Sequence, residues 1–211
     1  HPVQQPSKDR VSTFRQQYGL SLDDRVLIFV GRLGKEKNLP FLLECFAHIR
    51  EHEDVVKLLL VGDGPESMNL QQDCKRLHID TDVIFCGYIP HEEVFTAYEA
   101  ADIIVFPSKT ETQGLALLEG LSLGRPAVGL NAMGVEDILA GNYGGYLTEE
   151  SIETFSTPVI ELLRDKNLYA AKSKEAKIRA DAMSANRMAE ELLSVYKSLS
   201  ATYKEHFSSR S

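Results

Sequence analysis

Residues 102–129 read DIIVFPSKTETQGLALLEGLSLGRPAVG, and this stretch decides how the chain folds. It opens with an apolar run of strand length at 103–106, which Pro107 and Ser108 end. Gly114 then precedes an apolar helix over 115–123, and a second short strand follows at 127–128. A strand, a loop and a helix in this order are typical of one unit of a parallel sheet.

The anomaly within this stretch is Glu119, a carboxylate in a helix that is apolar on almost every side. Such a helix is normally buried, and a carboxylate that loses water needs polar partners. Helix N-termini bind anions through free N–H groups, and Gly114 lets a ligand approach the backbone. Glu119 can accept both hydrogens of a ribose diol, while Glu111 in the preceding loop can meet the hydroxyls of a sugar. A phosphorylated sugar therefore suits the segment, but the residues equally allow a surface Glu111 and a buried, backbone-bonded Glu119.

Composition limits the class of protein. The 211 residues fit one domain, and 43% hydrophobic and 26% charged residues are ordinary for a soluble globular protein. A formal net charge of −8 argues against nonspecific binding to nucleic acid, so an anionic ligand must be held locally. Cys45, Cys74 and Cys86 lack metal-ligand spacing and are interpreted as reduced thiols. The sequence also has no signal peptide and no run of roughly 18 apolar residues. Together with the reduced thiols, these features predict a cytoplasmic protein.

Strand and helix patterns alternate along the chain. Residues 1–8 are polar, contain two prolines and are interpreted as a linker, and residues 9–211 as one domain. Apolar runs at 25–30, 56–61 and 83–86 alternate with helical patterns at 39–53, 66–77 and 91–100, after a first helix at 10–18. The alternation predicts an α/β fold with a Rossmann-like, doubly wound parallel sheet flanked by helices. Helices are expected from residue 151 to roughly residue 204.

The loop at 31–38 follows the first strand and carries two glycines and three cations. Ligands of open parallel sheets bind at the carboxyl ends of strands, where the loops that begin at Gly31, Gly87, Pro107 and Asn131 are expected to share one edge. Arg32 and Lys37 can there neutralise phosphate oxygens, and solvated loop charges are the alternative. Asn38 is expected to cap the next helix.

Two further motifs are interpreted as turns. Residues 62–65, Gly-Asp-Gly-Pro, are similar to a dinucleotide fingerprint but have Ser67 where that pattern needs a third glycine. Asp80 and Asp82 have the spacing of a paired-carboxylate metal site, but their position just before a strand favours turn chemistry.

In this order, the motifs resemble the C-terminal, donor-binding half of a GT-B fold glycosyltransferase of family 4 (glycosyltransferase group 1). The resemblance covers about residues 25–147. It rests on Gly31-Arg32-Leu33 with Lys37-Asn38, on the motif at 61–65, on Ala101-Asp102 before Pro107-Ser108, and on Glu111 and Glu119 at the glutamate-x7-glutamate spacing. Each motif is weak alone, but the set in this order on this strand pattern is specific.

The resemblance implies that a hexosyl group moves from a nucleotide diphosphate sugar to a glycan or lipid acceptor with retention of anomeric configuration. It implies a catalytic role at the donor sugar for Glu111, as nucleophile or as electrostatic stabiliser. The resemblance assigns donor binding to seven residues: Gly31, Arg32, Lys37, Gln113, Gly114, Leu115 and Glu119. No metal or other cofactor is implied, because the cations and the helix end neutralise the departing diphosphate. A UDP-sugar is favoured over a GDP-sugar.

The residues also depart from the family pattern. Gln113-Gly114 replaces the usual Phe-Gly, which resembles the branch that glycosylates diacylglycerol. The resemblance implies an N-terminal acceptor domain outside these 211 residues, so the chain is expected to pair with that domain, to contact membranes only through it, and to be inactive alone. Such enzymes build cell-envelope polysaccharides or glycolipids. The alternative is a stand-alone nucleotide-binding module, whose apolar stripe packs on a partner or on its own sheet: Met188, Leu192, Val195 and Leu199.

Overall fold

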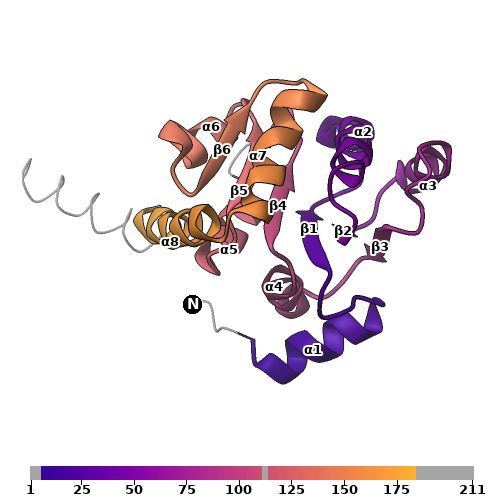
Figure 1. The fold of residues 1–211 in the computed structure, drawn as a ribbon, viewed down its shortest axis with the longest axis horizontal. Helices are drawn as coiled ribbons and strands as arrows, with labels where there is room; N and C mark the ends of the chain where they lie inside the picture. The colour runs from indigo at the N-terminus through magenta and orange to yellow at the C-terminus, as the bar shows by residue number, and fades with distance from the viewer. Residues whose placement is uncertain (1–5, 111–113, 184–211) are drawn as a thin grey trace, which may run out of the picture.

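The structure, a computed structural model, describes residues 6–110 and 114–183. These residues form one sheet of six parallel strands in the order β3-β2-β1-β4-β5-β6 (Figure 1). The strands are β1 (Arg25–Val30), β2 (Val56–Val61), β3 (Val83–Gly87), β4 (Ile103–Phe106), β5 (Ala127–Leu130) and β6 (Gly145–Thr148). The strand order reverses between β1 and β4, which confirms the predicted Rossmann-like, doubly wound sheet.

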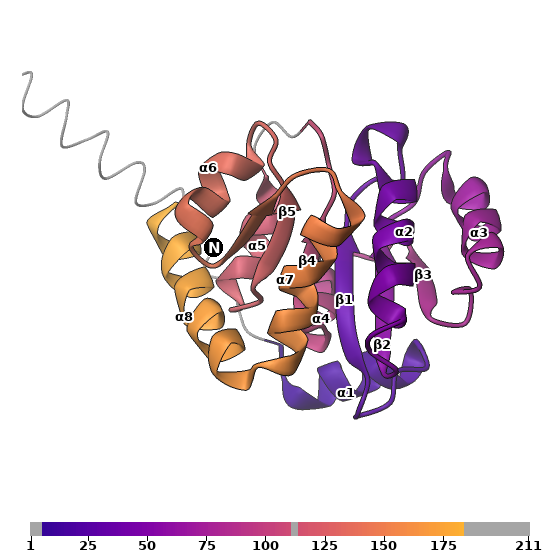
Figure 2. The same cartoon turned by 45° about the horizontal axis from the view of Figure 1, so that its top comes forward.

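Helices cover both faces of the sheet. They are α1 (Lys8–Gln17), α2 (Leu39–Arg50), α3 (Ser67–Arg76), α4 (His91–Ala100), α5 (Leu115–Ser122), α6 (Val135–Leu139), α7 (Ile152–Arg164) and α8 (Lys166–Ala182), with short 3₁₀ turns η1 (Lys35–Lys37) and η2 (Ala140–Asn142). Leu27 and Phe29 of β1 pack with α2, α3 and α7, whereas Val26 and Ile28 pack with α1, α4, α5 and α8 (Figures 1 and 2). Successive side chains of a strand point to opposite faces, so one apolar run supplies both cores.

Several element boundaries differ from the predicted ones. Helix α1 begins at Lys8, inside the segment interpreted as a linker, because Ser7 Oγ accepts a hydrogen bond from the Arg10 N–H (3.4 Å). Helix α2 ends at Arg50 rather than at residue 53, because the guanidinium of Arg50 donates to the carbonyls of Glu53 and Asp54 and holds the chain in a turn. Helix α6, with five residues, was too short to be predicted from periodicity.

The predicted C-terminal helices are confirmed as far as Ala182 by α7 and α8. The apolar stripe from Met188 to Leu199 lies outside the described residues. None of the helices that the structure describes is both long and apolar enough to cross a bilayer.

All loops that follow the strands leave the sheet at one edge, here called the carboxyl edge, which lies toward the top of Figure 2. The loops that begin at Gly31, Pro107 and Asn131 lie there, as predicted. The opposite edge, here called the amino edge, faces α1 in the same view. In an open parallel sheet of this order, ligands bind at the carboxyl edge near the reversal.

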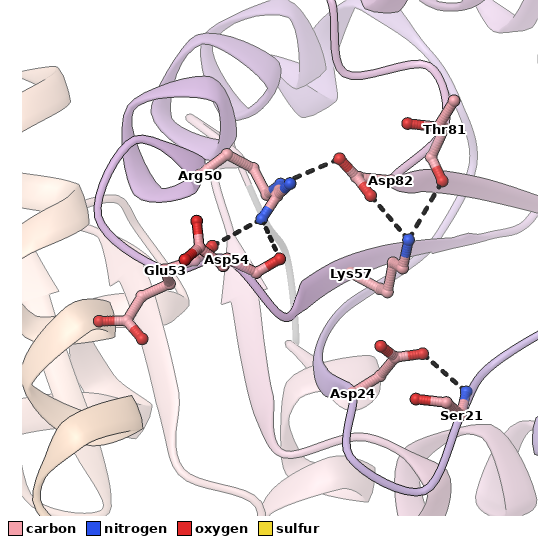
Figure 3. A network of polar contacts seen from close by, with 8 residues as sticks. All are labelled: Ser21, Asp24, Arg50, Glu53, Asp54, Lys57, Thr81 and Asp82. Atoms are coloured by element: carbon pink, nitrogen blue, oxygen red, sulfur yellow. Dashed lines mark hydrogen bonds and ion pairs between the residues drawn. The ribbon is translucent and has the colours of Figure 1, made fainter.

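An ion-pair network lies at the amino edge (Figure 3). Asp82 accepts hydrogen bonds from Arg50 Nε at 2.9 Å and from Lys57 Nζ at 2.7 Å, and Lys57 also donates to the Thr81 carbonyl at 3.3 Å. The interpretation of Asp82 as turn chemistry is therefore incomplete. Its carboxylate ties the end of α2 and the start of β2 to the start of β3.

Candidate functional site

The loop after β1 is fixed to the loop after β2 by backbone hydrogen bonds. The Gly31 N–H donates to the Val61 carbonyl (2.9 Å), the Leu33 N–H to the Asp63 carbonyl (3.0 Å), and the Glu66 N–H to the Leu33 carbonyl (3.1 Å). Leu33 is buried beneath them. The exposed side chain of Arg32 therefore projects from a backbone that is held on both sides.

Glycines make this contact possible. A Cβ on Gly62 would lie 2.0 Å from the Gly31 carbonyl oxygen, and one on Gly64 would lie 2.4 Å from the Leu33 carbonyl oxygen. Both distances are far below any van der Waals contact, so only glycine lets these backbones meet. The motif at 62–65 is interpreted from the sequence as a tight turn. It also packs against the backbone of the cationic loop after β1 and holds that loop in place.

A hollow of about 300 Å³ opens between the loops after β1, β2 and β3. Gly31, Arg32, Asp63 and Tyr88 contribute to its wall. Tyr88 is 82% exposed, an unusual state for a large aromatic ring. The hollow therefore offers a cation, a carboxylate and an aromatic face beside the reversal of the sheet.

Lys37 and Asn38 continue the same loop. Lys37 ends η1 and is half-buried. Asn38 is the N-cap residue of α2, as predicted, but it adopts a left-handed conformation (φ 53°) and its side chain makes no capping hydrogen bond. Its side-chain amide instead donates to Glu150 Oε1 (3.1 Å) just after β6. The same oxygen lies 2.6 Å from Lys109 Nζ, which joins the loops after β1, β4 and β6.

Helix α5 begins at the carboxyl edge behind a glycine with positive φ. Gly114 has φ 58°, and a Cβ there would lie 2.3 Å from Ile138 Cδ1 of α6. The first-turn N–H groups of a helix have no partner inside the helix, so they are available to an anion. Leu115 is 61% exposed at this helix start, so α5 is not buried on every side as expected.

Ser108 lies at the base of the loop between β4 and α5. It is fully buried, and its Oγ has no hydrogen-bond partner among the described residues. Glu111 and Gln113, predicted at the centre of this loop, lie outside the described residues.

Glu119 lies on α5 with a side chain that is 26% exposed. Within the described residues its carboxylate contacts His91 rather than a backbone N–H, with 3.8 Å between His91 Nε2 and Glu119 Oε1. Burial raises the pKa of Glu119, and the nearby His91 opposes this shift. Tyr98 lies alongside and donates its hydroxyl hydrogen to the Ala116 carbonyl. The carboxylate is thus half-desolvated yet still open to a ligand.

His91 and Glu150 were missed by sequence reasoning. Both follow a strand closely at the carboxyl edge, and this position is the only signal that the sequence gives for them. Among the described residues, the one group of three potential metal ligands lies at the end of α2, away from these loops.

Residues 11–179 match the family model for glycosyl transferases group 1. The chain belongs to the group 1 glycosyltransferase family. A family member from Bacillus anthracis, N-acetyl-alpha-D-glucosaminyl L-malate synthase, is 32% identical over 163 residues, which are 77% of this chain and 42% of that protein. Alpha-monoglucosyldiacylglycerol synthase of Streptococcus pneumoniae is 36% identical over 121 residues, which are 57% of this chain and 27% of that protein. The chain thus spans less than half the length of these relatives.

A solved structure shares the fold. The crystal structure of Anabaena Alr3699/HepE in complex with UDP and glucose superimposes with a TM-score of 0.80 at 22% identity. The match covers 92% of this chain and 53% of that one. The part of that longer protein that shares this fold is therefore about half of its chain.

Proposed function

We propose that this chain is the C-terminal, donor-binding half of a retaining GT-B glycosyltransferase of family 4. The whole enzyme would move a hexosyl group from a nucleotide diphosphate sugar to a glycan or lipid acceptor. One observation carries the proposal. The cation-bearing loop after β1, the start of α5 and the half-buried Glu119 all lie at the carboxyl edge, on either side of the strand reversal.

Each group has a task in this proposal. Arg32 and Lys37 bind the diphosphate, and Gly31 keeps the backbone close to it. Gly114, Leu115 and Gln113 offer backbone groups to phosphate and sugar. Glu119 accepts hydrogen bonds from the ribose diol, and Glu111 acts at the donor sugar. A diphosphate gains negative charge as it leaves, so fixed cations and N–H groups aimed at it lower the barrier without a metal.

The acceptor is assigned to the part of the enzyme that this chain lacks. Two relatives whose names give different products, a glucosaminyl malate and a monoglucosyldiacylglycerol, match this same chain over less than half of their length. A shared donor half joined to different acceptor halves accounts for this. The proposed enzyme works in the cytoplasm on cell-envelope or glycolipid precursors, and only its other half touches a membrane.

The proposal is tested by thermal unfolding of the purified chain with UDP, UDP-glucose, UDP-N-acetylglucosamine, GDP and GDP-mannose. A ligand that binds only the folded state adds about 2.7 kcal/mol at a hundredfold excess over its Kd, or roughly 5 to 10 °C in Tm. We expect a shift with the uridine ligands, unchanged in EDTA. No shift with any of the five would contradict donor binding by this chain.

Two variants test whether the Tm shift arises from nucleotide bound at the proposed donor site. Arg32→Gln should lose most of it, because the diphosphate loses a charged partner. Arg76→Gln is the matched control, since Arg76 pairs with Asp73 on the surface of α3. Equal loss in both variants would mean that the nucleotide binds by general charge attraction.

A further inference from the structure

A second cluster of polar side chains lies at the C-terminal end of α2, far along the helix from the proposed donor site: His48 is in the last turn, and Glu51 and His52 follow it directly. His48, Glu51 and His52 are spaced at i, i+3 and i+4, which places them on one face of the turn. Their potential ligand atoms all lie within 4.8 Å of one another. His48 Nδ1 lies 3.7 Å from Glu51 Oε2, and the two imidazole rings lie 4.8 Å apart between centroids.

These distances are close to those of a metal site. Ligand atoms about 2.1 Å from a tetrahedral Zn²⁺ lie about 3.4 Å from each other. The contact between His48 and Glu51 is already within a few tenths of an ångström of that value. Glu51 and His52 are exposed, so small side-chain rotations can close the remaining gap without moving the backbone.

A hydrogen bond fixes the tautomer of His52 that can bind a metal. Its Nδ1 lies 2.9 Å from the His48 carbonyl oxygen. A carbonyl oxygen can only accept, so Nδ1 carries the hydrogen, and the lone pair of the neutral ring is left on Nε2. Metal-binding histidines commonly donate their second N–H to a carbonyl in this way, which fixes the ring for the metal.

The surroundings favour a cation at this position. The C-terminal end of a helix carries partial negative charge, which attracts positive ions. Each nearby guanidinium group pairs with a carboxylate, Arg50 with Asp82 and Arg164 with Glu53 (2.6 Å), and these pairs weaken the repulsion of a bound cation. Arg50 also binds the carbonyls that follow the turn, and Figure 3 shows it bridging these carbonyls and Asp82. The turn is therefore held firmly on the protein.

We propose that His48, Glu51 and His52 form a binding site for a divalent transition metal of the zinc class at the amino edge of the sheet. Two imidazoles and one carboxylate suit Zn²⁺, Ni²⁺ or Cu²⁺ rather than Mg²⁺, which prefers oxygen ligands. Three protein ligands leave a fourth position for water or for a group of another molecule. The site lies at the edge opposite the proposed donor site, so it serves the fold or an assembly and takes no part in sugar transfer.

The test is a titration of the untagged, EDTA-treated chain with Zn²⁺, followed by calorimetry and by thermal unfolding. We expect one saturable site and a rise in Tm that Mg²⁺ at the same concentration does not produce. The variant with both His48→Gln and His52→Gln should lose Zn²⁺ affinity by about tenfold or more and should lose the rise in Tm. Its Tm without metal should match that of the parent, which shows that it folds.

His78→Asn is the matched control. It removes one exposed imidazole outside the cluster, and asparagine tolerates the left-handed backbone that His78 adopts (φ 58°). This variant should keep the Zn²⁺ affinity of the parent, whereas Glu51→Gln should weaken it severalfold. Equal Zn²⁺ affinity in the parent and in the double histidine variant would overturn the proposal.

Discussion

Gly114 occupies a position where a side chain has neither a suitable backbone conformation nor space. Its φ of 58° is left-handed, and a Cβ would lie 2.3 Å from Ile138 Cδ1. Gly19 shares the left-handed conformation (φ 67°), but a Cβ there would have no neighbouring atom within 4 Å. A side chain at Gly114 would therefore meet both backbone strain and a steric clash, whereas one at Gly19 would meet backbone strain alone.

Gly114→Ala is expected to lower the free energy of unfolding by about 2 kcal/mol or more, because strain and clash add. Gly19→Ala should lose only the strain, about 1 kcal/mol. Denaturant unfolding of both variants checks the difference. Equal losses would show that α6 yields to the new methyl group at no cost. Nucleotide binding should weaken only in Gly114→Ala, because the start of α5 moves.

The ionised carboxylate of Glu119 is expected to lower the stability of the fold but to strengthen nucleotide binding. Burial holds its pKa above the ordinary value, so folding favours the protonated form and the ionised carboxylate lowers stability at neutral pH. Glu119→Gln removes the charge. We expect its Tm at about pH 7 to exceed that of the parent, and the difference to shrink as the pH falls below the raised pKa and to vanish below the unfolded-state pKa of 4.5.

The same variant should bind UDP about tenfold more weakly, because an amide cannot accept both hydrogens of the diol. Glu92→Gln, at an exposed position of α4, is the control and should change neither quantity. A Glu119→Gln variant with unchanged UDP affinity would refute the assignment of Glu119 to the ribose.

At the scale of elements, one carboxylate at the amino edge joins three elements. Asp82 joins α2, β2 and β3 through Arg50 and Lys57, and its side chain is only 12% exposed. Burial raises its pKa, but the hydrogen bond from Lys57 and the charges of both cations outweigh this and hold the pKa below its ordinary value. The stabilisation is therefore present above the unfolded-state pKa of 3.8 and is lost as the pH falls through the lower folded-state pKa.

Asp82→Asn should lower the free energy of unfolding by about 2 to 3 kcal/mol at neutral pH, because two partly buried cations lose their counter-ion. The difference from the parent should shrink below about pH 4. Asp73→Asn is the control, because its pair with Arg76 is more exposed and such pairs contribute under about 1 kcal/mol. Denaturant unfolding across this pH range makes the comparison, and a difference independent of pH would contradict the ionic account.

At the scale of the molecule, the chain spans 42% of one relative and 53% of a structural neighbour. The proposal makes this chain the donor-binding half and assigns the acceptor to a second half. We therefore expect the purified chain to show no multiple-turnover transfer from UDP-sugars, measured as UDP release with a mixture of lipid and sugar acceptors. Sustained turnover would show that this half is sufficient and would refute the division of labour.

The proposal also predicts the role of Glu111, which can be tested in an enzyme that joins this chain to an acceptor half. Glu111→Gln should reduce transfer strongly while leaving UDP affinity nearly intact, because this residue is assigned to the sugar and not to the nucleotide. Loss of UDP binding in that variant would instead place Glu111 with Glu119 at the nucleotide.

Local sequence alone specifies the strands, their alternation with helices and the loops that carry glycine and charge. These features depend on neighbours within a few residues, such as the apolar run of β1 and the glycine that follows it. The position of the described loops after β1, β4 and β5 at one edge followed as well, because parallel strands place all their carboxyl ends together.

Which polar groups meet depends on the tertiary structure. The side chain of Asn38 donates to Glu150 across 112 positions of sequence instead of to the first turn of its own helix. Glu119 faces His91, and Asp82 joins Arg50 and Lys57. Such pairs depend on the three-dimensional register of elements that are far apart along the chain. No local pattern encodes them, because a charged residue in a loop looks the same in sequence whether its partner is a protein side chain or water.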